Sequence, residues 1–172
     1  MLTALPDSAR AWVFAALGGA DRLGDELHAA VHEFTRHWTS HGRPVPADAA
    51  DATPAGFPGA VLVVAAQLSD DEVNAGVSGC GIDAMQHALD AAVAAGGAEL
   101  ASPLSVAYRD ADGAWQVVPR PAFRALARSG RVDGETRVLD LTATTLGQLR
   151  AGGVERAAAA AWHGRAFRLA PA

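Results

Sequence analysis

The chain has 172 residues, 50% of them hydrophobic, and a formal net charge of -5. This length fits one domain spanning residues 1–172, and the apolar content is enough for a hydrophobic core. The negative charge argues against a nucleic-acid or membrane-surface binder, because such proteins present a basic face.

Two residue types restrict the chemistry further. Lysine does not occur, so all 14 cationic side chains are arginine. Schiff-base catalysis by lysine and the phosphate-binding lysine of a P-loop are therefore excluded. Cys80 is the single cysteine, which excludes an intramolecular disulfide and an all-cysteine metal site. The first ten residues lack a signal-peptide pattern, and we expect a soluble cytoplasmic protein without a cofactor.

The first part of the chain predicts two strands separated by a helix and a loop. Residues 10–17 form an apolar run bounded by turn residues, which indicates a buried strand. Apolar residues recur at helical spacing over 21–41, and residues 43–59 are rich in Pro, Gly and Ala, as in a loop. The continuous apolar run 59–68 predicts a strand in the centre of a sheet.

The second part predicts a helix, a hairpin and shorter elements. Residues 82–97 read as a helix closed by two glycines, and 104–119 as two strands around a turn. A short helix is predicted over 121–130, a strand over 135–144 and an Ala-rich helical tail over 145–168. This order indicates an α/β or α+β domain, with one mixed sheet of about five strands and helices packed on it.

Four of the six histidines lie on the predicted helix 21–41 or at its end, in two pairs with i, i+4 spacing. That spacing suits a metal, but His28 and His37 fall on roughly opposite helix faces, so the four rings cannot meet at one ion. His28 and His32 lie on the predicted solvated face, and we expect no metal site. His41 falls on the inward face, where it either caps the helix or faces a pocket.

The segment "VSGCGID", residues 77–83, follows a strand and opens a helix. Gly79 and Gly81 permit a tight turn that leaves backbone N–H groups free at the helix start. A helix N-terminus lowers a thiol pKa, so Cys80 is a candidate nucleophile. Asp83 opposes this, because a nearby carboxylate raises a thiol pKa and could itself cap the helix.

Two other interpretations of this segment stay open. Free cysteine is one of the most frequently buried residue types, so Cys80 can be a packing residue. Alternatively, Ser78 and the backbone amides bind an anionic ligand without any covalent step. Near the C-terminus, Trp162, His163 and Arg165 form a group of the kind that holds planar or anionic ligands.

These motifs together resemble a family of small, uncharacterised bacterial proteins that are often labelled "ABC transporter ATPase". The family pattern has an R-x-W strand, a W-x-x-H-G helix end, a central S-G-C-S-I-D and a C-terminal W-H-x-R. Gly81 departs from it, since the family has serine there. The ATPase label is not expected to hold, because the chain has no G-x-x-x-x-G-K-[ST] motif. The matching residues are Arg10, Trp12, Trp38, His41, Gly42, Ser78, Gly79, Cys80, Ile82, Asp83, Trp162, His163 and Arg165.

We hypothesise that these positions converge on one pocket at the end of the sheet. As an enzyme, Cys80 would attack a carbonyl or thioester, with His41 or His163 as general base. As a binding protein, the amides with Arg10 or Arg165 would hold a phosphate or carboxylate. A scaffold in which the motifs only pack is the third alternative. The expected ligand-binding residues are Arg10, Trp12, Trp38, Ser78, Gly79, Gly81, Asp83, Trp162 and Arg165.

Overall fold

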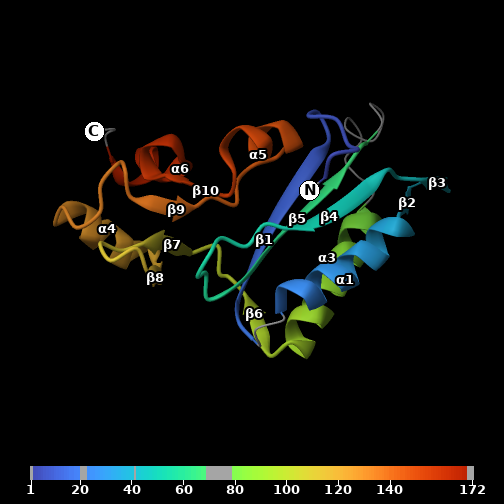
Figure 1. Ribbon diagram of the computed structural model, residues 1–172, viewed down its shortest axis with the longest axis horizontal. Helices are drawn as coiled ribbons and strands as arrows, with labels where there is room; N and C mark the ends of the chain where they lie inside the picture. Colours follow the sequence, from blue (N-terminus) through green and yellow to red (C-terminus); the bar gives the residue numbers. More distant parts are fainter. Residues whose placement is uncertain (1, 20–22, 41, 69–78, 170–172) are drawn as a thin grey trace.

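The fold was analysed in a computed structural model. It describes residues 2–19, 23–40, 42–68 and 79–169, with the side chains at 79 and 80 outside the description. The chain forms two halves, each built around a four-stranded antiparallel sheet, that pack against each other (Figure 1). No helix in the described ranges is long and apolar enough to cross a membrane.

The first sheet has the order β4-β5-β1-β6. Its centre is the long antiparallel pair of β1 (Arg10–Gly18) and β5 (Gly59–Ala66). The apolar run of β5 is buried over nearly its whole length, because the sheet is covered on both faces. β4 (Ala47–Asp51) and β6 (Ala98–Leu100) add the two edges.

Two helices, α1 (Leu23–Arg36) and α3 (Gly79–Ala95), cover one face of this sheet (Figure 1). The buried residues of α1 recur every four positions and so form one apolar stripe. Alternate residues of β1, beginning with Trp12 and Phe14, pack against this helical layer. α1 is followed by a small hairpin of β2 (Thr39–Ser40) and β3 (Arg43–Pro44).

The second sheet has the order β10-β9-β7-β8. The predicted hairpin is present as β7 (Ser105–Arg109) and β8 (Trp115–Pro119), and β9 (Arg137–Leu139) and β10 (Glu155–Ala157) extend it. Helices complete this half. They are α4 (Arg120–Arg128), α5 (Leu146–Gly152), the 3-10 helix η1 (Ala158–Ala160) and α6 (Trp162–Phe167).

The two halves share a core on the other face of the first sheet. Ala11 and Ala15 of β1 pack there with Trp115, Leu139 and Leu146 from the second half. Arg10 also pairs with Thr145 through an isolated antiparallel bridge. This shared core joins the halves into one continuous structure.

The expected α/β class is confirmed, but the expected single mixed sheet is wrong. The described chain has three antiparallel sheets with 4, 2 and 4 strands. The hairpin of β7 and β8 pairs with β9 and not with β1, so the strands divide between two sheets. The predicted loop 43–59 contains β3 and β4, and the predicted helix 21–41 ends at Arg36. Contacts between residues far apart in the sequence determine which strands pair.

Candidate functional site

The predicted site residues of β1 lie at the end of the first sheet where α3 begins. Arg10 pairs with Ala66, the last residue of β5, and its side chain is exposed. Because side chains alternate along a strand, Arg10 and Trp12 occupy the face that α1 and α3 cover. Trp12 is half-buried and packs against the helical layer. The positive charge of Arg10 therefore lies at the exposed end of the layer that α1 and α3 form.

Trp38 belongs to the same end of the molecule. It follows the last turn of α1 and is only 3% exposed. Its ring centroid lies 5.9 Å from that of Trp12 and 5.3 Å from that of Phe34. These contacts fix the indole in a small core cluster with Val45 and Ala66.

The indole nitrogen of Trp38 faces the first turn of α3. A Cβ atom built on Gly81 would lie 2.6 Å from Trp38 Nε1 and 3.3 Å or more from the nearest ring carbons. Glycine at this position therefore allows the indole edge to pack directly on the helix backbone. Both Trp38 Nε1 and Ser40 Oγ are buried, and neither has a hydrogen-bond partner among the residues that the structure describes. A buried N–H without an acceptor is costly and rare in native proteins.

The backbone N–H groups in the first turn of α3 are further hydrogen-bond donors near the indole N–H of Trp38. α3 begins at Gly79, so Cys80 is its second residue and Gly81 its third. The first N–H groups of a helix have no partner within the helix and carry its positive dipole end. No acidic residue lies in this first turn. Asp83 lies in the second turn with an exposed side chain, and its backbone carbonyl oxygen lies 2.7 Å from His87 Nδ1. The capping role expected of its carboxylate stays a prediction.

Three of the predicted site groups cannot be placed here. His41 and Ser78 lie outside the described residues, and so does the side chain of Cys80. The roles expected for them stay predictions. What the structure brings together at this end is Arg10, Trp12, Trp38 and the Gly79–Gly81 turn.

The remaining predicted residues lie elsewhere, on α6. Figure 1 shows α6 at the end of the molecule opposite α1 and α3, beside the second sheet. His163 is 1% exposed and its ring lies between aromatic rings, with the Trp162 centroid at 4.0 Å and the Phe123 centroid at 6.1 Å. Arg165 is exposed. The pocket expected to contain all the motif residues therefore does not include Trp162, His163 and Arg165.

Burial dominates the acid–base behaviour of His163. It lowers the pKa of the ring from 6.5 to about 4, with Asp140 opposing the shift and Arg120 adding to it. His163 Nδ1 is buried without a partner. A ring in this apolar environment is neutral at pH 7 and packs as a core side chain.

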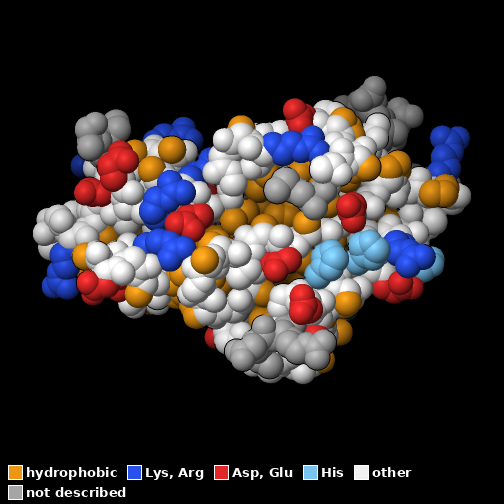
Figure 2. Space-filling view, in the orientation of Figure 1, with side chains coloured by type: hydrophobic (Ala, Val, Ile, Leu, Met, Phe, Trp, Pro, Cys, Tyr) orange, Lys and Arg blue, Asp and Glu red, His pale blue; other side chains and the backbone are white. Residues whose placement is uncertain are grey.

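His28 and His32, expected on a solvated face, are half-buried and lie against β4. Figure 2 shows histidine side chains next to each other over α1. His28 Nε2 lies 3.0 Å from the carbonyl oxygen of Ala49, and His32 Nε2 lies 3.9 Å from Asp48 Oδ1. Within the residues that the structure describes, no group of three or more His, Cys, Asp or Glu side chains could hold a metal.

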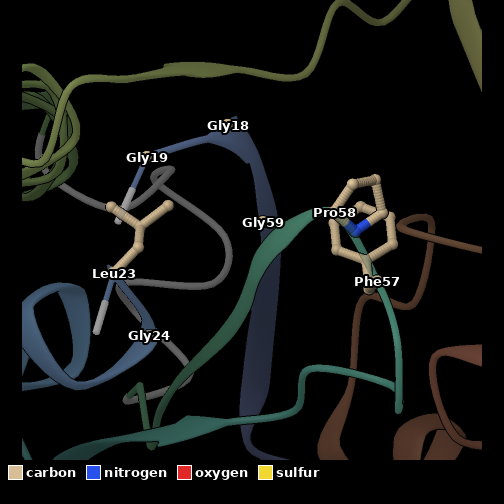
Figure 3. Close-up of a pocket in the computed structure, with 7 residues that line it drawn as sticks. All are labelled: Gly18, Gly19, Leu23, Gly24, Phe57, Pro58 and Gly59. Carbon is tan, nitrogen blue, oxygen red and sulfur yellow. The ribbon is translucent and has the colours of Figure 1, made fainter. Parts of the chain in front are cut away.

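A cavity of about 400 Å³ opens at the other end of β1 and β5 (Figure 3). Glycines form most of its lining, and Leu23, Phe57 and Pro58 provide its side chains. The nearest carboxylate to Gly24 is that of Asp51, whose Oδ1 accepts hydrogen bonds from Thr53 N and Oγ1. This cavity lies far along β1 from Trp38, and the described residues of its lining present no side-chain donor.

Several buried polar groups in the structure had no signal in the sequence. Asp140 is 4% exposed, accepts hydrogen bonds from Thr142 and lies 3.5 Å from Arg156 Nη1. Arg156 Nε is buried without a partner. Ser40 was likewise not predicted, because it occupies one of the unspecified positions of the W-x-x-H-G motif. Only the pairing of β9 with β10 places Asp140 beside Arg156.

Substitution of Gly81 tests the contact between α3 and Trp38. We expect Gly81→Ala to lower the free energy of unfolding by about 1–2 kcal/mol, because the added methyl group displaces a ring fixed in the core. Gly24→Ala is the matched control, since its Cβ would meet Asp51 Oδ2 at an ordinary 3.4 Å. It should gain up to ~1 kcal/mol from helix propensity. Urea denaturation measures both, and a gain in both variants would contradict the contact.

Comparison with models of protein families, with curated proteins and with solved structures finds no match for this sequence. The function is therefore argued from the site itself.

Proposed function

We propose that the protein binds a small anionic ligand at the N-terminus of α3. The observation that carries the proposal is the buried, unpartnered Nε1 of Trp38 against Gly81. An acceptor atom of a ligand would satisfy this N–H together with backbone N–H groups of the first turn. Arg10, on the same side of β1, supplies the compensating charge.

The sequence motifs support the same location. Three of the four motifs that carry the resemblance to the small bacterial family contribute residues here, namely Trp12, Trp38 and the helix start at Gly79 and Cys80. The fourth motif, on α6, packs in the other half. Pockets that combine apolar walls with a few convergent donors are the usual form of small-molecule sites.

Thermal unfolding with added anions tests this proposal. Acetate, benzoate and phosphate are added separately, and at least one of them should raise the Tm of the wild-type protein. Arg10→Gln should reduce that increase, whereas Arg128→Gln, which changes an exposed arginine of α4, should retain it. Cys80→Ser should also retain it, because binding requires no thiol. If no anion raises the Tm, the motifs serve packing alone, as expected of a scaffold.

Thiol chemistry at Cys80 is a second candidate function. Its support is the position of Cys80 as the second residue of α3, in a first turn without acidic residues, since a helix N-terminus favours a thiolate. In this case Cys80 would attack a carbonyl or thioester carbon of the bound ligand, and the first-turn N–H groups would hold the oxyanion.

The rate of alkylation of Cys80 against pH tests the second candidate. An apparent pKa clearly below ~8.5 would indicate an accessible thiolate and favour nucleophilic chemistry. An absence of reaction until the protein unfolds would identify a buried packing residue and leave ligand binding as the function. The single thiol of the chain makes the signal unambiguous.

A further inference from the structure

We infer that the surface formed by α4 and α6 binds the phosphate backbone of a nucleic acid. The charges of the chain are divided unequally between its two halves. Residues 1–100 contain 4 arginines and 13 acidic residues, a net charge of -9, whereas residues 101–172 contain 10 arginines and 6 acidic residues, a net charge of +4. The whole-chain charge of -5, which argued against a nucleic-acid binder, conceals this positive half.

Ion pairing divides the arginines of the second half into two groups. Arg109, Arg137, Arg150 and Arg156 form ion pairs with carboxylates. Within the part of the chain that the structure describes, the other six form no ion pair, and residues 170–172 beyond it are Ala, Pro and Ala. Figure 1 shows α4 and α6 at the same end of the molecule. The six are exposed residues of these helices or follow directly after them, namely Arg120, Arg124, Arg128, Arg131, Arg165 and Arg168.

The arginines of α4 occupy positions that are unfavourable for the helix itself. Arg120, Arg124 and Arg128 recur every four residues, so they are neighbours along the helix, and like charges at this spacing repel. Arg120 is also the first residue of α4, where the helix dipole disfavours a cation, and the first turn has no acidic residue. A negatively charged partner along α4 would relieve both repulsions.

Aromatic rings of α6 hold two of these guanidinium groups in place. Arg120 Cζ lies 4.7 Å from the ring centroid of Trp162, and Arg124 Cζ lies 5.8 Å from that of Phe167. The rings of Phe167 and Phe123, with centroids 4.9 Å apart, join α6 to α4 beneath them. A guanidinium stacked on a ring keeps the N–H groups at the edge of its plane available to phosphate oxygens.

The acidic side chains of this half leave most of the positive charge uncompensated. Asp140 is buried, and Glu155 forms an ion pair. The turn 110–113, which contains two aspartates, lies at the opposite end of β8 from α4. Asp133 and Glu135 follow α4 and are exposed. These two carboxylates are outnumbered by the six exposed arginines.

The scarcity of apolar anchors favours a nucleic acid over other anionic partners. Leu104, whose carbonyl oxygen accepts a hydrogen bond from Arg120 N, is the one large hydrophobic side chain that is exposed in the described chain. A protein partner buries several aromatic or aliphatic anchors, and a membrane surface takes up large apolar side chains. Contacts with a phosphate backbone need mainly charge and hydrogen-bond donors, so this surface suits a nucleic acid of any sequence.

Fluorescence anisotropy with a labelled DNA duplex and a labelled RNA strand, each of mixed sequence, tests the inference. At least one should bind the wild-type protein with a Kd of about 1–100 µM near physiological salt. With three phosphate contacts, the affinity should fall about 40-fold between about 50 and 200 mM salt. Arg120→Gln/Arg124→Gln should weaken binding and make the slope of log affinity against log salt shallower by about 2.

Arg36→Gln/Arg43→Gln is the matched control, because it removes two exposed arginines of the first half and changes the net charge equally. It should bind as the wild type does. The Tm of each variant shows whether it folds, and Arg165→Gln/Arg168→Gln on α6 replaces the α4 variant if that one does not.

The inference fails if neither nucleic acid binds at about 50 mM salt, where electrostatic binding is strong. It fails equally if the control loses as much affinity as the α4 or α6 variant. Binding of phosphatidylserine vesicles or salt-sensitive self-association, without binding of nucleic acid, would assign the surface to another anionic partner. All these outcomes leave the ligand site proposed at α3 untouched, because Arg10 and Trp38 lie in the other half.

Discussion

We expect the titration of His163 alone to lower the free energy of unfolding by about 2 kcal/mol between pH 7 and pH 5. Between pH 7 and pH 4 the loss should reach about 3 kcal/mol. The folded protein holds the pKa of His163 at about 4, against 6.5 for an ordinary histidine. Between these values the unfolded chain binds a proton that the folded chain does not. The stability that depends on a neutral His163 is therefore fully present above pH 6.5 and is lost as the pH falls toward 4.

Urea denaturation at pH 7, 6 and 5 measures this effect, and His163→Leu should remove most of it. Leucine has a similar volume and leaves no unpartnered ring nitrogen, so the variant should be about as stable as the wild type at pH 7. His87→Leu is the control, since His87 is exposed and its removal should leave the pH dependence unchanged. An unaltered pH dependence in His163→Leu would show that another group carries it.

Glu155 is a second acid-sensitive group, but its effect on stability occurs at a lower pH and does not interfere with the measurement on His163. The hydrogen bond from Arg109 lowers the pKa of Glu155, so the stability contributed by this carboxylate is lost below its ordinary value of 4.5. The ion pair is the 2.8 Å contact of Arg109 Nε with Glu155 Oε1, which joins β7 to β10. The window between pH 7 and pH 5 therefore reports mainly His163.

The elements that the sequence predicted are the ones with strong local patterns. β5 is a continuous apolar run, and α3 ends at Ala95, two residues before Gly97, whose φ of 66° favours glycine. β4 was not predicted because Ala and Asp have low strand propensity. It forms because its backbone completes the hydrogen bonds along β5. Likewise, β6 and β10 have three residues each, too few to show an alternating pattern. β9 lies within the strand predicted over 135–144.

The candidate site was predictable only in part, for the same reason. The glycines and the helix start around Cys80 form a local motif, and the structure confirms a helix from Gly79. The contact between Trp38 and Gly81 depends on how α1 packs against α3, which no local pattern encodes. His163 resembled a site residue because it stands between Trp162 and Arg165. Its burial against Phe123 is a tertiary property, and this burial separates it from Cys80.

The largest loss of stability from a single methyl group is expected at Gly59, the first residue of β5. A Cβ at Gly59 would lie 2.0 Å from the carbonyl oxygen of Ala16 and 3.0 Å from Leu17 Cα. These are backbone atoms of the paired strand, so no side-chain rotation relieves the clash. The strands must separate where β1 and β5 form the centre of the first sheet. We expect Gly59→Ala to cost about 3 kcal/mol or more.

Gly56→Ala is the matched control for this substitution. Gly56 has a φ of 72° and its Cβ would meet no atom within 4 Å, so alanine there incurs only the backbone strain of about 1 kcal/mol. Thermal and urea unfolding of both variants separate the two effects, and equal losses would contradict the strand clash. Gly59 also lines the cavity in Figure 3. A much larger loss at Gly59 would show that strand pairing is enough to require glycine at this position, without any ligand in the cavity.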